Sequence, residues 1–143
     1  MSSLGFLDFL EDGVSAALRQ KMRRAARRFG VAPEEYVVQV AKGILFGESD
    51  VVLSVQGSCM HASEPKVSVP YKEYEAFEVV LLRDGKFESV AKVFGGDSEM
   101  RAKMEPYLMK VSKHDKFYAR VPKAVVQELF EALEAKFGKA RVA

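Results

Sequence analysis

The chain has 143 residues, of which 48% are hydrophobic and 29% charged, and its formal net charge is +2. This composition is typical of one globular domain and argues against a disordered chain. No apolar run approaches the ~18–20 residues that a membrane-spanning helix needs, and the first residues lack the pattern of a signal peptide. A single cysteine excludes an internal disulfide, so we expect one cytoplasmic domain over residues 1–143.

Two helices are expected near the start of the chain. Phe6, Phe9 and Leu10 can share one face of a short helix, and this apolar face must be covered by the domain itself or by another subunit. A basic helix follows, because apolar residues recur at helical spacing from Val14 to Phe29. Six cations and no acid lie between residues 18 and 29, at Arg19, Lys21, Arg23, Arg24, Arg27 and Arg28.

Repulsion between the cations of the basic helix suggests that the helix binds an anionic partner. Like charges four residues apart destabilise a helix slightly. An anionic partner would offset this repulsion, although a solvated basic face without a partner is an alternative.

After the basic helix, Pro33 begins another predicted helix, which Gly47 ends. Its apolar stripe includes Val40, Ala41 and Ile44.

The middle of the chain alternates apolar and polar residues, as antiparallel strands do. Strands are predicted over 50–56, 66–71, 76–82 and 86–94. The last two form a hairpin around Asp84-Gly85. A two-residue loop would pair Leu82 with Phe87. A three-residue loop would pair Leu81 with Phe87 and give a cleaner apolar face, so we favour it.

The last third predicts a helix, a second hairpin and a final helix. Asp97 or Ser98 caps a short helix that contains Met100 and Met104. Residues 107–111 and 116–121 form the hairpin, and Pro122 begins a helix that ends at Gly138, with a basic tail beyond. These elements predict an α+β fold in which an antiparallel β-sheet meander packs with an N-terminal helix pair and a C-terminal helix.

Cations and aromatic side chains are interleaved in the second hairpin. Strand alternation places Tyr118 and Arg120 together on the face opposite the core. Cations that track phosphates and rings that stack on bases are what single-stranded nucleic acid requires. The alternative for Tyr118 is an ordinary strand aromatic packed under a helix. The candidate binding residues of this segment are Tyr107, Lys116, Phe117, Tyr118 and Arg120.

Catalytic and metal-binding patterns are weak. Cys59, His61 and His114 are the only soft ligands, and their spacing matches no zinc signature. The carboxylates form no pair that suggests acid–base catalysis, and no glycine loop has a phosphate-binding spacing. We therefore expect no metal, no cofactor and no enzymatic activity.

The absence of Asn, Thr and Trp beside many charges is a tendency of thermophile proteins. Without Asn, direct reading of bases is disfavoured, which points to sequence-tolerant binding. The order of elements, the basic helix over 19–28 and the aromatic and cationic segment over 107–120 resemble the ThermoDBP group of archaeal single-stranded DNA-binding proteins. The resemblance implies homo-oligomers that hold single-stranded DNA in a cleft between helices and sheet.

Sequence-tolerant binding of single-stranded nucleic acid by a homodimer is therefore the leading hypothesis. One alternative is a small apolar ligand held in a helix-grip, START-like fold, in which a long helix closes over a curved sheet. Another is a protein-interaction module that docks through residues 4–10 and the last helix.

Overall fold

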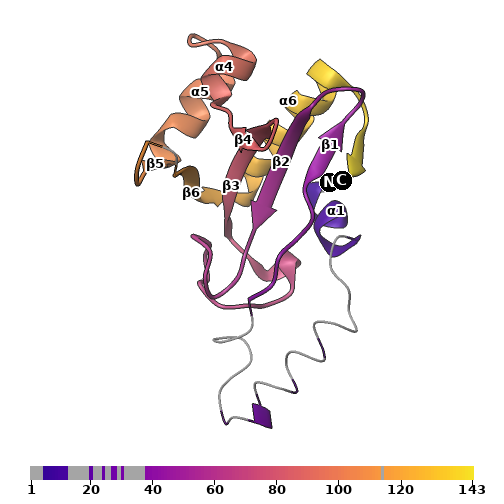
Figure 1. The fold of residues 1–143 in the computed structure, drawn as a ribbon, viewed down its shortest axis with the longest axis vertical. Coiled ribbons are helices and arrows are strands. Elements are labelled where there is room, and N and C mark those ends of the chain that lie inside the picture. Colours follow the sequence, from indigo (N-terminus) through magenta and orange to yellow (C-terminus); the bar gives the residue numbers. More distant parts are fainter. Residues whose placement is uncertain are drawn as a thin grey trace.

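The computed structural model describes residues 5–12, 20, 24, 27, 28, 30, 38–113 and 115–143. These residues form an antiparallel sheet of seven strands with helices packed against it (Figure 1). The α+β fold predicted from the sequence is confirmed.

The strands follow the order β5-β6-β3-β2-β1-β7, and β4 also pairs with β3. Their bounds are β1 (Ile44–Phe46), β2 (Val51–Gln56), β3 (Ala76–Arg83), β4 (Lys86–Phe87), β5 (Leu108–Lys110), β6 (Lys116–Pro122) and β7 (Ala140–Val142). Strand β2 pairs along one edge of β3 from Glu78 to Arg83. Strands β4 and β6 therefore share the other edge of β3, end to end.

The described helices are α1 (Phe6–Asp12), α4 (Val90–Phe94), α5 (Glu99–Met104) and α6 (Lys123–Phe137), with 3-10 turns η1 (Tyr71–Glu73) and η2 (Glu105–Tyr107). Helix α6 lies behind the sheet in Figure 1, with α1 beside it. Their side chains and one face of the sheet make the core. The opposite face of the central strands, which we call the open face, has no described helix against it (Figure 1).

The apolar residues of α1 are covered within the chain. Phe6 and Leu10 are fully buried. The Phe6 ring meets Phe77 of β3 edge-on at 5.6 Å, and the Phe9 ring lies 5.5 Å from Phe130 of α6. The short helix predicted here is confirmed, and the domain itself supplies its cover.

The helix predicted from Pro33 to Gly47 is wrong over its second half. Residues 38–43 have no regular secondary structure and Ile44–Phe46 form β1, while residues 31–37 lie outside the described part. Gln56 Oε1 accepts from the Ala41 N–H at 2.9 Å, and Gln56 Nε2 donates to the Ala41 carbonyl at 2.8 Å. A side chain thus satisfies the backbone groups that a helix would have satisfied.

The strand predicted over 66–71 is also wrong. Residues 66–70 form a loop that leads into η1, and Tyr71 is fully buried. The backbone finds side-chain partners here in place of a strand ladder. The Tyr74 hydroxyl donates to the Val67 carbonyl and accepts from the Val69 N–H. The alternation of apolar residues therefore reflects packing of a loop against the core.

In the first hairpin, the favoured three-residue loop is wrong. Leu82 pairs with Phe87 and Arg83 with Lys86, so the loop is the two-residue alternative. Asp84 and Gly85 have φ values of 53° and 73°, as a type I′ turn requires. Strand β4 ends at Phe87 because the chain turns into α4, and the apolar face expected over 86–94 does not exist.

The C-terminal predictions are confirmed except at the last residues. Ser98 caps α5, α6 follows Pro122, and Gly138 ends it. The residues expected as a basic tail form β7, which pairs with β1 and completes the sheet. Strand β7 lies next to α1 (Figure 1). Just before β7, the Lys139 carbonyl accepts from the Gly47 N–H at 2.9 Å.

Candidate nucleic-acid interface

A gap in the sheet creates a hollow on the open face. Strand β6 pairs with β3 up to Val79, and β4 pairs with it only from Leu82. Between these positions none of the described strands pairs with this edge of β3, although the Glu88 N–H donates to the Leu81 carbonyl at 2.8 Å. The gap opens because Ser89 caps α4, its Oγ accepting from the Lys92 N–H at 3.1 Å, and the chain leaves the sheet there.

We call this hollow the groove; its volume is about 880 Å³. Its floor is the open face of β3 and β6, one wall is the β3–β4 turn, and the other is the β5–β6 turn. The lining residues are Glu78, Val80, Leu82, Gly85, Lys86, Phe87, Val111, Lys113, Asp115, Lys116 and Phe117.

Two aromatic rings line the groove from different strands. Phe87 comes from β4 and Phe117 from β6, and both are half-buried. The Lys116 ammonium lies 5.9 Å from the centre of the Phe87 ring, within the range of a cation–π contact. The groove therefore offers apolar ring surface with a cation directly beside it.

Three lysines surround these rings. Lys86 and Lys113 are exposed and Lys116 is half-buried. Among the described residues, no carboxylate lies within ion-pair distance of any of the three. By contrast, Arg83, Arg101 and Arg120 each have a carboxylate within 4.0 Å. The positive charges of the groove are thus available to an anionic ligand.

Two carboxylates also line the groove, and both accept hydrogen bonds from their own surroundings. Glu78 Oε1 accepts from the Ala62 N–H at 3.2 Å. Asp115 Oδ2 accepts from the Ser112 hydroxyl at 3.1 Å. With three lysines and two carboxylates, the groove lining has a net charge of about +1. The two hydrogen bonds hold the carboxylates in place within the groove.

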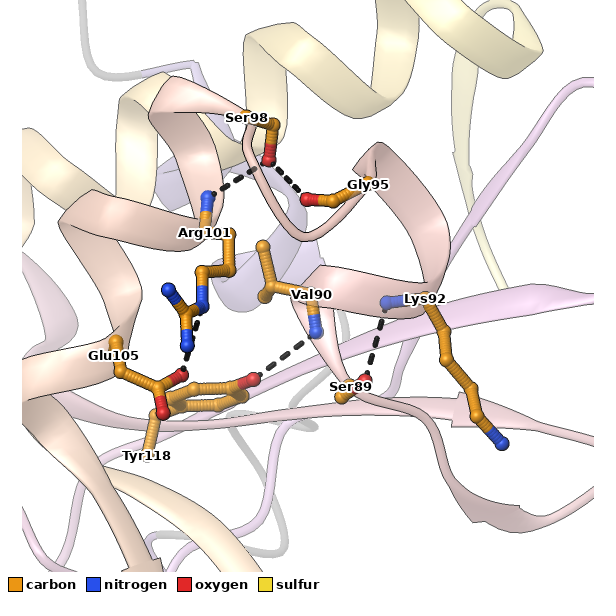
Figure 2. A network of polar contacts seen from close by, with 8 residues as sticks. All are labelled: Ser89, Val90, Lys92, Gly95, Ser98, Arg101, Glu105 and Tyr118. Atoms are coloured by element: carbon orange, nitrogen blue, oxygen red, sulfur yellow. Dashed lines mark hydrogen bonds and ion pairs between the residues drawn. The ribbon is translucent and has the colours of Figure 1, made fainter.

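The prediction that Tyr118 lies opposite the core is wrong. The side chain is 1% exposed, and its hydroxyl accepts from the Val90 N–H at 3.1 Å (Figure 2). The Arg101–Glu105 ion pair lies close to the ring in the same view. Burial raises the pKa of the Tyr118 phenol, the Val90 N–H lowers it, and Glu105 raises it. The ring has no free face on which a base could stack.

A β-bulge explains why alternation failed for Tyr118. Phe77 pairs with Val121 and Val79 with Tyr118, so three steps along β6 match two along β3. The extra residue lets Tyr118 and Val121 both face the core. Arg120 takes a positive φ of 50°, and its N–H donates to the Ala62 carbonyl at 2.9 Å.

The other predicted binding residues are divided by the structure. Lys116 and Phe117 lie in the groove. Tyr107 is half-buried against the core. Arg120 lies at the far end of β6, paired with Glu64 at 4.0 Å. In the basic helix Arg24, Arg27 and Arg28 are helical and exposed, whereas Arg19, Lys21 and Arg23 lie outside the described residues.

Sequence reasoning missed the β4 side of the groove. Lys86 and Phe87 were read only as positions in a long strand. The two-residue turn would have revealed Phe87, since pairing Leu82 with Phe87 places these two side chains on the same face of the sheet. Glu78, which also lines the groove, is half-buried.

The Cys59–His61 region has the geometry of a structural loop. Ser58 Oγ and His61 Nδ1 are 2.6 Å apart, but Ser58 is fully buried and cannot meet a substrate. Burial lowers the pKa of His61, and the nearby Glu78 carboxylate raises it in part. Within the part of the chain that the structure describes, no group of three or more His, Cys, Asp or Glu could hold a metal ion.

Helix α6 lies directly against the core face of the sheet, where Leu129 and Leu133 are fully buried. The groove is on the other face, so it is not the pocket between helix and sheet that a helix-grip protein requires. None of the described helices has the length and apolar character to span a membrane. Comparison with protein-family models, with curated proteins and with solved structures finds no match to this chain.

Proposed function

We propose that this protein binds single-stranded nucleic acid in the groove, with little dependence on sequence. The observation that supports this is the placement of Phe87 and Phe117 in one hollow with three lysines that have no carboxylate partner among the residues the structure describes. Rings give every base a stacking surface, and lysines attract the phosphates between bases. An open sheet face admits a flexible strand, whereas a duplex hides the faces of its bases.

In this proposal the rings and the cations have separate roles. Phe87 and Phe117 stack on bases, and Lys86, Lys113 and Lys116 contact phosphates. Tyr118 supports Phe87 from beneath, with ring centres 5.9 Å apart. The exposed Arg24, Arg27 and Arg28 provide further phosphate contacts outside the groove.

The decisive experiment is fluorescence anisotropy with a labelled twelve-nucleotide DNA of mixed sequence, with single-stranded and duplex competitors. Replacing Phe117 with Ala should weaken binding by about 1–3 kcal/mol, because one stacked base is lost. Phe94→Ala is a matched control, since that half-buried ring belongs to α4 and does not line the groove. Wild-type protein that binds no single strand at low salt would refute the proposal.

We also propose that the protein works as a homodimer. The apolar residues of α1 no longer require a second subunit. Met109 and Val111 remain 49% and 67% exposed at the edge strand β5 and beside it. A second copy could cover them. Light scattering at micromolar concentration should give twice the chain mass, and a monomer mass for the wild type would contradict this.

The cytoplasm of a thermophilic archaeon is the setting that the composition and the resemblance suggest. The expected signature is a melting temperature above about 90 °C, the usual mark of hyperstability. A calorimetric transition near ~60 °C, within the mesophile range, would contradict the thermophile proposal.

A further inference from the structure

Glu78 stands at the end of the groove nearest the 58–64 loop. Its Oε1 is held by the Ala62 N–H at 3.2 Å, and the side chain is half-buried. No cation of the described residues forms an ion pair with it. A carboxylate in this position repels phosphates, so its role in a site for nucleic acid must concern another part of the nucleotide.

Glu78 lies in the same groove as a stacking ring. The bulge in β6 falls opposite Glu78, between the Phe77–Val121 and Val79–Tyr118 pairs. Beyond Tyr118 the strands no longer pair, but Phe117 lines the same groove as Glu78 and Val80. A base stacked on Phe117 would therefore share the groove with the Glu78 carboxylate.

We propose that Glu78 makes the groove prefer bases that carry an exocyclic amino group, cytosine above thymine. This inference rests on the proposed function. A carboxylate only accepts hydrogen bonds, and the N4 amino group of cytosine donates them. Thymine presents the O4 acceptor at the same position, and two acceptors repel each other. Glu78 thus sets a preference, while stacking and phosphate contacts supply sequence-tolerant affinity.

The test compares twelve-nucleotide oligodeoxycytidine and oligodeoxythymidine by fluorescence anisotropy at constant salt and pH 7.5. Both are pyrimidine strands with the same charge, so phosphate contacts cancel in the ratio. Wild-type protein should bind the cytidine strand about tenfold tighter, the effect of one hydrogen bond to a charged group. In Glu78→Gln the ratio should fall toward one, because an amide also donates to thymine O4.

Two features keep the test decisive. Gln retains an oxygen that can accept from the Ala62 N–H, so Glu78→Gln should fold. Glu73→Gln is the control, because it removes one charge from an exposed residue of η1 and should leave the ratio unchanged. Equal binding of both strands by wild type, or a ratio that survives Glu78→Gln, overturns this inference alone. Failure to bind either strand overturns the proposed function and this inference together.

Discussion

The hydroxyl of Tyr118 accepts a hydrogen bond from the backbone N–H of Val90 at 3.1 Å. This contact joins strand β6 to the first residue of α4, where a backbone N–H has no partner within its own helix. The same ring lies 5.9 Å from Phe87, so it also supports one wall of the groove. A residue predicted to contact a base therefore acts from beneath the proposed site.

Replacing Tyr118 with Phe should lower the free energy of unfolding by about 1–3 kcal/mol, because the buried Val90 N–H loses its acceptor. Affinity for single strands should change little, since the ring remains in place under Phe87. Tyr107→Phe is the control and should be nearly neutral. Urea unfolding monitored by circular dichroism measures the free energy of unfolding of the wild type and of the two variants. A large affinity loss with unchanged stability would mean that Tyr118 contacts nucleic acid directly.

Removing the groove lysines should change the salt dependence of binding. For single strands the log–log slope of affinity against salt is about −0.7 per phosphate contact. Replacing Lys86, Lys113 and Lys116 with Ala should therefore make the slope less steep by about 2. Lys66, Lys72 and Lys92 are exposed lysines that do not line the groove, and their triple variant is the matched control. Equal slopes for the two triple variants would count against the groove.

Gly47→Ala should destabilise the protein strongly. Gly47 has a φ of 54°, and a Cβ built there lies 2.0 Å from the Phe137 carbonyl oxygen. Strain and overlap together should cost at least about 2 kcal/mol. Gly85→Ala tests the backbone strain alone, because Gly85 has a φ of 73° but a Cβ there meets no atom within 4 Å. This variant should lower the free energy of unfolding by about 1–2 kcal/mol. Denaturation midpoints that rank the two variants the other way would refute the close approach of β1 and α6.

His61 should make stability depend on pH. Burial lowers the pKa of folded His61 from its ordinary value of 6.5, so below that pH the unfolded chain binds more protons. The stability that the protein gains from keeping His61 neutral is fully present above pH 6.5. It is lost as the pH falls toward the lowered pKa of His61 in the folded protein. Urea unfolding should therefore show that acidification from about pH 7.5 to 5.5 destabilises wild type more than His61→Gln. Parallel pH profiles would show that His61 does not contribute.

The sequence by itself determined the elements whose signals are local. Ser98 at the start of α5, Pro122 before α6 and Gly138 after it are capping and terminating residues, and their chemistry acts within one turn of a helix. The alternation over residues 50–56 predicted β2 for a similar reason, since one buried face fixes a period of two. The cationic and aromatic character of the second hairpin was also readable, and it located Lys116 and Phe117.

Only the tertiary structure decided which side chains meet in the groove. The bulge that turns Tyr118 inward depends on pairing between β3 and β6, which are separated by more than thirty residues in the chain. The strand at Ile44–Phe46 depends on partners supplied by β2 and β7. Backbone hydrogen bonds between distant segments leave no periodic mark on a short run of residues. For that reason the gap that exposes Phe87, and the position of Glu78 beside it, could not be read from the sequence.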